Sequence, residues 1–290
     1  MEGHYLFIYK VFYPLFWISM NFREKLDKIV DKNNSLLCVG LDIDKDKIPK
    51  YLFQQYKDPF FEFNKQIIDE TKDLVCGYKI NMAFYEVLGE NGYMLLEKTI
   101  KYIPKDVVVI LDGKRNDIGN TAKKYAESLF ETLNADGVTI NPYLGFDGIK
   151  PFIEYKNKCS FILCRTSNSS AGDFQDLKLD DKYLYEKVAE KIVEWNKNYS
   201  NCGAVVGATY PDELKIIRKI LGENIPLLIP GVGKQGGDVE KTVKYGTNKQ
   251  SRMAIINSSR GIIYANSTEN FAQKSRDKTI ELRDQINKYR

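Results

Sequence analysis

The sequence contains a single histidine, His4, among its 290 residues. A mechanism that needs a histidine base, or a metal site rich in histidine, is therefore close to excluded. Aspartate, glutamate, lysine, serine, threonine and tyrosine are left as candidate catalytic side chains. The five cysteines are an odd number without C-x-x-C spacing: Cys38, Cys76, Cys159, Cys164 and Cys202. This pattern predicts reduced core residues in a cytoplasmic protein.

The sequence also lacks a large excess of charge of one sign. Its formal net charge is +4, and lysine and glutamate are interspersed along the helical stretches without forming a basic stripe. Nucleic acid is therefore not an expected partner. The remaining composition, with 43% hydrophobic and 12% aromatic residues, is sufficient for a large buried core.

No hydrophobic run is long enough to cross a bilayer. The most apolar stretch, residues 1–19, is interrupted by Lys10 and Pro14, and it has neither the basic start nor the small-residue cleavage site of a signal peptide. We interpret it as an N-terminal extension of unknown role that precedes a single domain at residues 20–290. A peripheral membrane contact of this stretch is the alternative, and no stable membrane association is expected.

Eight apolar runs that stop at polar or glycine-rich ends are predicted to be strands. They cover 36–42, 75–81, 107–114, 137–143, 161–168, 204–209, 226–233 and 254–260. Helical patterns lie between them at 60–73, 91–101, 120–133, 147–156, 182–197, 211–221 and 238–245, and a terminal one covers 269–288. Eight alternating strands and helices are typical of an α/β fold of the (β/α)₈ or TIM barrel type.

The stretch from Val107 to Thr121, VVVILDGKRNDIGNT, is the most informative of these runs. Its unbroken apolar part predicts a strand that is covered on both faces. Asp112 and Lys114 are two residues apart, so both side chains leave the same face while the chain stays extended, and Asp117 follows in the turn. The pattern D-x-K-x-x-D alone is also compatible with a solvated turn in a highly charged chain.

The ends of the other strands carry polar groups that would join these charges. In a TIM barrel the carboxyl ends of all strands meet at one mouth, where the active site lies. The predicted ends bring Asp42 from the first strand, Lys79 and Asn81 from the second, Thr166 and Ser167 from the fifth, and Ser258, Ser259 and Arg260 from the eighth. Their common position favours a functional site over separate surface ion pairs.

The seventh strand is followed by PGVGKQGGD, in which Gly231 to Gly236 match the dinucleotide pattern G-x-G-x-x-G. The position argues against a dinucleotide site, because this motif belongs after the first strand of a nucleotide-binding fold and needs an acid at the end of the next strand. Glycines after the seventh strand and an arginine after the eighth instead match the phosphate site of barrels. Tight turns that need glycine are the structural alternative.

Taken in order, CVGLD, YKIN, LDGKRNDIGNT, RTSN, PGVGKQGGD and NSSRG resemble the motifs of the orotidine 5′-monophosphate decarboxylase family, over roughly residues 21 to 285. The resemblance implies that Asp42 and Lys79 contact the ribose, that Asp112 faces the substrate carboxylate, and that Lys114 delivers the proton. The implied catalytic residues are Lys79, Asp112, Lys114 and Asp117. The implied substrate-binding residues are Asp42, Asn81, Ile118, Thr121, Thr166, Ser167, Pro230, Gly231, Gln235, Gly236, Ser259 and Arg260.

The resemblance also implies what the protein does and how it assembles. It implies decarboxylation of orotidine 5′-monophosphate to uridine 5′-monophosphate, the last step of pyrimidine synthesis, without a metal or another cofactor. It further implies a homodimer in which Asp117 and Thr121 reach the neighbouring subunit's site. The chain departs from many relatives at Lys234, at Ser259 and at Asn168–Ser169, where some members have His-Pro. A magnesium-dependent sugar-phosphate decarboxylase or aldolase and a non-catalytic nucleotide-binding barrel are the alternatives.

Overall fold

A computed structural model describes residues 20–233 and 236–290, and the predicted N-terminal extension lies outside these residues. Eight parallel strands close into a barrel in the order β1-β10-β9-β8-β5-β4-β3-β2. The strands are β1 Leu37–Gly40, β2 Gly77–Asn81, β3 Val108–Arg115, β4 Gly137–Ile140, β5 Cys159–Arg165, β8 Cys202–Val206, β9 Leu227–Pro230 and β10 Ala254–Ser258. Each lies within or overlaps one predicted run, so the (β/α)₈ barrel prediction is confirmed.

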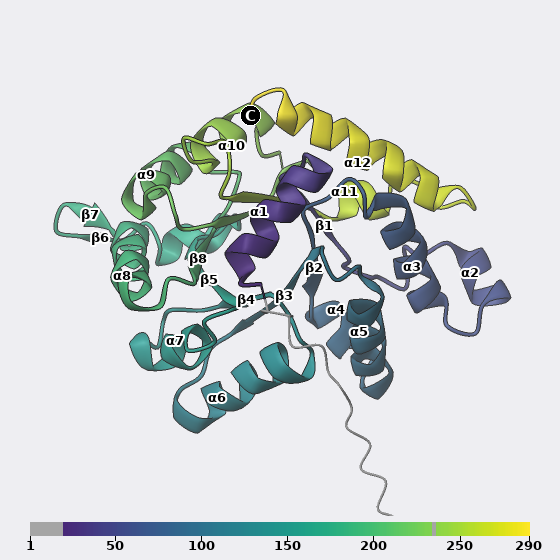
Figure 1. Ribbon diagram of the computed structural model, residues 1–290, viewed down its shortest axis with the longest axis horizontal. Helices are drawn as coiled ribbons and strands as arrows, with labels where there is room; N and C mark the ends of the chain where they lie inside the picture. The colour runs from purple at the N-terminus through teal and green to yellow at the C-terminus, as the bar shows by residue number, and fades with distance from the viewer. Residues whose placement is uncertain (1–19, 234–235) are drawn as a thin grey trace, which may run out of the picture.

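Most of the helices surround the barrel and cover the outer face of its sheet (Figure 1). The helices of the described chain are α1 Phe22–Asn33, α2 Lys50–Gln55, α3 Pro59–Thr71, α4 Ala83–Glu86, α5 Glu90–Tyr102, α6 Gly119–Glu127, α7 Phe146–Ile153, α8 Leu184–Tyr199, α9 Pro211–Leu221, α10 Val239–Gly246, α11 Arg260–Ile263 and α12 Phe271–Asn287. Local signals set their ends: α9 begins with a proline and two acidic residues and stops at Gly222, whose φ of 71° favours glycine.

The structure differs from the prediction mainly in short elements. The predicted helix at 120–133 divides into α6 and a π-helical turn at Ser128–Thr132. The two-residue strands β6 Lys178–Leu179 and β7 Lys182–Tyr183, and the short helices α2, α4 and α11, were not predicted as separate elements. Segments of two to six residues are too short to establish a hydrophobic period.

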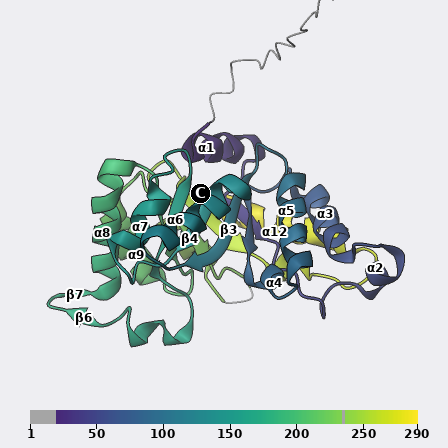
Figure 2. The same ribbon diagram turned by 90° about the horizontal axis from the view of Figure 1, so that it is seen from below.

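Helix α1 closes the amino-terminal end of the barrel. Asn21 caps it through a reciprocal capping box with Glu24, and the Phe22 ring packs edge-on against Phe161 at 5.6 Å between centroids. Lys25 Nζ lies 2.6 Å from Asp136 Oδ2. Figure 2 shows α1 at one end of the molecule and the loops with α4, β6 and β7 at the other. The opposite mouth, at the carboxyl ends of the strands, is therefore the open one.

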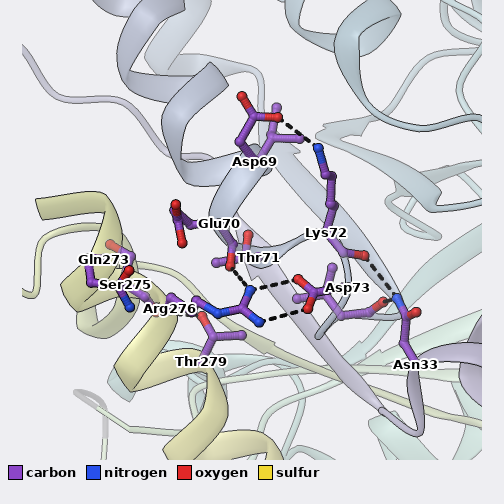
Figure 3. A network of polar contacts seen from close by, with 12 residues as sticks. Asn33, Asp69, Glu70, Thr71, Lys72, Asp73, Gln273, Ser275, Arg276 and Thr279 are labelled. Carbon is purple, nitrogen blue, oxygen red and sulfur yellow. Dashed lines mark hydrogen bonds and ion pairs between the residues drawn. The ribbon is translucent and has the colours of Figure 1, made fainter.

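The last helix is fastened to the turn between α3 and β2 (Figure 3). Both terminal nitrogens of Arg276 lie 2.8 Å from the carboxylate oxygens of Asp73, and Arg276 also donates to the Glu70 carbonyl at 2.7 Å. Asn33, at the end of α1, donates to the Lys72 and Val75 carbonyls on the same turn. The first and last helices thus both contact the turn that precedes β2, the strand that carries Lys79. Within residues 20–233 and 236–290, no helix is both long and apolar enough to cross a membrane.

Candidate active site

A cavity of about 560 Å³ opens at the carboxyl ends of the strands. Eleven of the predicted site residues line it: Asp42, Lys79, Asn81, Asp112, Lys114, Thr166, Ser167, Pro230, Gly231, Ser259 and Arg260. They come from strands far apart in the sequence, and the closed barrel brings them together. The prediction of one shared mouth is therefore confirmed for these residues.

The other predicted residues lie outside this cavity or outside the described chain. Asp117, Ile118 and Thr121, in the loop after β3 and the first turn of α6, do not line it, and Gly236 does not either. Asp117 Oδ1 accepts the backbone N–H of Ile118, whose side chain is 54% exposed. Of the three charged residues at the end of β3, Asp112 and Lys114 therefore lie at the cavity of their own chain, and Asp117 does not. Gln235 lies outside the described residues.

Three charged side chains form the floor of the cavity. Lys79 Nζ lies 2.9 Å from Asp112 Oδ2, and Lys114 Nζ lies 2.7 Å from Asp112 Oδ1. Lys79 Nζ is also 3.9 Å from Asp42 Oδ1. Asp112 and Lys79 are both buried, whereas the Lys114 side chain is 46% exposed toward the cavity. Lys114, which faces the cavity, is thus held by the Asp112 carboxylate, and the buried Lys79 ammonium contacts that carboxylate from its other side.

The protonation states follow from these distances. Burial by itself raises the pKa of Asp112, but the adjacent charges of Lys79 and Lys114 outweigh it and hold that pKa well below its usual range. Burial would lower the pKa of Lys79, but Asp42 and Asp112 outweigh it and raise that pKa above its usual value. Asp112 and Lys79 are therefore both ionised at neutral pH.

The backbone between Asp112 and Lys114 is not a regular strand. The pairing of β3 with β4 shifts between Leu111, opposite Val138, and Arg115, opposite Ile140, so extra residues bulge from β3. Lys114 has a φ of 44°, a left-handed conformation that disfavours residues other than glycine by roughly 1–2 kcal/mol. Both side chains were expected to leave the same face only while the chain stays extended, and at Lys114 it does not. The Lys114 side chain nevertheless contacts Asp112.

The loops after β9 and β10 form the part of the mouth predicted to hold phosphate. Gly231, Gly233 and Gly236 have φ of 105°, 88° and 83°, so the turn uses conformations that glycine adopts readily. A Cβ on Gly40 would lie 1.8 Å from Ser259 Oγ, so the first strand must carry glycine for Ser259 to sit at the cavity wall. Arg260 is exposed and has no ion-pair or hydrogen-bond partner for its guanidinium among the described residues. Backbone N–H groups and this guanidinium could bind an anion together.

The loop after β5 encloses a different side of the cavity. The Gln175 side chain holds Thr166 at both its backbone N–H, at 2.8 Å, and its hydroxyl, at 2.9 Å. Arg165, 2% exposed, supports the loop through an ion pair to Asp176 at 2.9 Å. A Cβ on Gly207, the residue after β8, would lie 2.7 Å from the Ser167 Cβ, so this position leaves space for Ser167 only as glycine. Thr166 and Ser167 are thereby held at the cavity wall.

Several cavity residues were not predicted from the sequence. They are Lys47, Phe84, Thr139, Leu163, Gln175, Val205, Leu228, Val232, Asn257 and Gly261. Ser258, expected at a strand end, and Asn168, noted only as a departure from relatives, line the cavity as well. Thr139 and Asn257 had a signal, since each is a polar residue within an apolar strand. Lys47 and Gln175 had none, because loop residues reach the cavity only through the path of the folded loop. No cluster of three histidine, cysteine or acidic residues suited to a metal occurs in the described part of the chain.

A model of the family described as "Orotidine 5'-phosphate decarboxylase / HUMPS family" matches residues 35–274. The chain belongs to this family. An orotidine 5'-phosphate decarboxylase of Dehalococcoides mccartyi is 50% identical over 275 residues, which cover 93% of this chain and 99% of the relative. A relative of the same name in Cellvibrio japonicus is 48% identical over 273 residues, covering 92% of this chain and 98% of the relative.

A solved structure of the Leishmania donovani OMP decarboxylase has the same barrel. It is 35% identical, its TM-score is 0.77, and the match covers 91% of this chain and 99% of that one. The family resemblance inferred from six motifs is thus confirmed over nearly the whole chain.

Proposed function

We propose that this protein decarboxylates orotidine 5′-monophosphate to uridine 5′-monophosphate and CO₂, the last step of pyrimidine synthesis. The observation that carries the proposal is the cluster of Lys79, Asp112 and Lys114 on the floor of the cavity. It lies in a chain whose curated relatives, at 48–50% identity, are named for this reaction.

The chemistry explains why a cation must lie at the floor. When the bond from the ring carbon to the carboxylate breaks, the electron pair stays on that carbon, in the plane of the ring, and CO₂ leaves. The Lys114 ammonium stabilises the developing negative charge and then transfers one proton to the carbon, which leaves a neutral amine that solvent reprotonates. Its 46% exposure toward the cavity leaves it accessible to the ring.

Asp112 has two roles in this proposal. Ionised by its position between two lysines, it holds the Lys114 ammonium in place through the 2.7 Å contact. Its negative charge also lies where the substrate carboxylate must bind, and that repulsion ends as neutral CO₂ departs. Lys79 keeps Asp112 ionised and in place, and with Asp42 it reaches the ribose.

Binding of the phosphate group supplies energy that one lysine cannot. The enzymes with the largest rate accelerations lower the activation free energy by about 20 kcal/mol, and this requires contributions from contacts far from the reacting atom. We assign the phosphate to Gly231, Ser259 and Arg260 in the cavity, with Gln235 and Gly236 in the same loop. Thr166 and Ser167 bind the pyrimidine. The loop after β5 closes over the bound nucleotide.

We propose that the protein is a homodimer whose sites are shared. Asp117, Ile118 and Thr121 are outside the cavity of their own chain, so their proposed roles require a neighbouring subunit. Exposed apolar side chains follow three adjacent strands, β2, β3 and β4, with Val87 79%, Ile118 54% and Tyr143 81% exposed. A second copy that covers these side chains would remove them from water, which favours association.

We place the protein in the cytoplasm. All five cysteines are free and buried, as suits a reducing compartment.

We propose that the reaction needs no metal or other cofactor. The loss of substrate, followed by its absorbance at 285 nm, should therefore be unchanged by EDTA. Loss of activity in EDTA, restored by Mg²⁺, would instead favour the sugar-phosphate class of enzyme.

The variant Lys114→Ala tests the assignment of the reaction centre. It removes the cation and the proton donor, so turnover should be abolished while binding of uridine 5′-monophosphate, measured by calorimetry, stays largely intact. Lys219→Ala, at an exposed position on α9, is the matched control and should keep full activity. A kcat near that of the wild type in Lys114→Ala would refute the assignment, and tight nucleotide binding by an inactive wild type would indicate a binding protein.

A further inference from the structure

Thr139 lies on β4, beside the bulged end of β3, and only 1% of it is exposed. Its hydroxyl donates to Asp112 Oδ1 at 2.8 Å and accepts the backbone N–H of Lys114 at 3.0 Å. We propose that Thr139 is a positioning residue for the decarboxylation, because its hydroxyl joins the carboxylate of Asp112 to the backbone of Lys114. This inference rests on the roles proposed above for Asp112 and Lys114.

The hydroxyl replaces a hydrogen bond that the bulge removes from the sheet. Between Leu111 and Arg115 the pairing with β4 is interrupted, and Lys114 takes a left-handed φ of 44°. A buried N–H without a partner is strongly unfavourable, and strained backbone persists only where its surroundings hold it. Thr139 Oγ1 satisfies that N–H and thereby stabilises the conformation from which the Lys114 side chain reaches Asp112.

The second bond fixes the carboxylate. Asp112 Oδ2 accepts Lys79 Nζ at 2.9 Å, while Oδ1 accepts both Lys114 Nζ and the Thr139 hydroxyl. When Lys114 transfers its proton, it loses its charge, and its hydrogen bond to Oδ1 weakens. The Thr139 hydroxyl is neutral throughout and continues to donate. It therefore keeps Asp112 oriented during the step in which Lys114 cannot.

The neighbours of Thr139 make a purely structural explanation insufficient. β4 reads Gly-Val-Thr-Ile and is buried along its whole length, where a valine would have the same branched shape. A buried hydroxyl needs a partner to offset its desolvation. The partners of this one are the carboxylate and the main chain of the reaction centre, so the hydroxyl, and not the methyl group, is the part of Thr139 that the site uses.

The test compares Thr139→Val, which keeps the shape and removes the hydroxyl, with Thr139→Ser, which keeps the hydroxyl and removes the methyl group. Thr139→Val should lower kcat about 10- to 100-fold, the effect expected from a small displacement of reacting groups, with KM little changed. Thr139→Ser should keep a kcat close to that of the wild type. Thr279→Val, which removes an equally buried hydroxyl bonded to the Ser275 carbonyl on α12, is the control and should keep kcat.

Three results would overturn the inference. The first is a wild-type kcat in Thr139→Val, and the second is a raised KM with an unchanged kcat in that variant. The third is an equal loss of kcat in Thr139→Ser, which would assign the effect to packing of the methyl group. If Thr139→Val does not fold, Thr139→Ala and Thr139→Ser isolate the hydroxyl in the same way. Lys114→Ala measured in parallel separates the two proposals. An active Lys114→Ala refutes the reaction centre, whereas an inactive Lys114→Ala beside a fully active Thr139→Val refutes only the role of Thr139.

Discussion

Replacing Lys79 by methionine should destabilise the protein strongly at neutral pH. The Lys79 side chain is 5% exposed, and its Nζ lies 2.9 Å from Asp112 Oδ2 and 3.9 Å from Asp42 Oδ1. Methionine keeps much of the length and removes the charge. Two carboxylates would then face each other at the floor of the cavity without the cation that they share.

The size of the effect follows from burial. Removing one partner of a buried ion pair destabilises by about 3–5 kcal/mol, and the lower end, about 3 kcal/mol, applies here because Lys114 and Thr139 still contact Asp112 Oδ1. Lys32→Met is the matched control. Its ion pair with Asp106 is shorter, at 2.6 Å, but the two side chains are 67% and 47% exposed. An exposed pair of this kind contributes about 0–1 kcal/mol.

The pH dependence gives a second, independent signature. The pKa of Asp112 in the folded protein is below its unfolded value of about 3.9, so its ion pairs stabilise above that value, and the contribution is lost as the pH falls through the folded pKa. In Lys79→Met the pKa of Asp112 rises, and its carboxyl group becomes neutral at a higher pH. The difference from the wild type should therefore shrink as the pH falls from 7 to about 4.

Urea denaturation at pH 7 and pH 4, at one fixed protein concentration, measures both quantities. A loss below about 1 kcal/mol at pH 7 would refute the buried-pair reasoning, since that is the size of an exposed pair. A loss that stays the same at both pH values would show that packing, and not the charge of Asp112, sets the effect.

Two further variants test the remaining assignments. Arg260→Ala should mainly raise KM for the nucleotide, because a charged hydrogen bond of about 1.5–3 kcal/mol to phosphate is lost. An unchanged KM would argue against a phosphate site, and Arg283→Ala on α12 is the control. Asp117→Ala and Lys114→Ala should each be inactive, but a mixture refolded together should regain about a quarter of wild-type activity, since half of its dimers carry one intact site. A mixture that stays inactive would mean that Asp117 serves its own chain.

Much of the site could be predicted because the barrel gives each strand end a known destination. Asp42, Lys79 and Asp112 end apolar runs, and parallel strands in a closed barrel must bring those ends to one mouth. The same reasoning placed Thr166 and Arg260 correctly. It failed for loop residues such as Lys47 and Gln175, whose side-chain directions depend on the path of the folded loop and leave no periodic trace in the sequence.

The stretch from Val107 to Thr121 shows most clearly what the sequence alone determines and what only the tertiary structure decides. Its sequence determined a buried strand and the presence of charges at its end, because unbroken apolar residues need cover on both faces and charges need a solvated end. Only the tertiary structure decided which charges meet. The pairing of β3 with β4 sets the bulge, the bulge sets the backbone of Lys114, and the hydroxyl of Thr139, 25 residues further along, satisfies it. These contacts depend on register between strands, which no local pattern encodes.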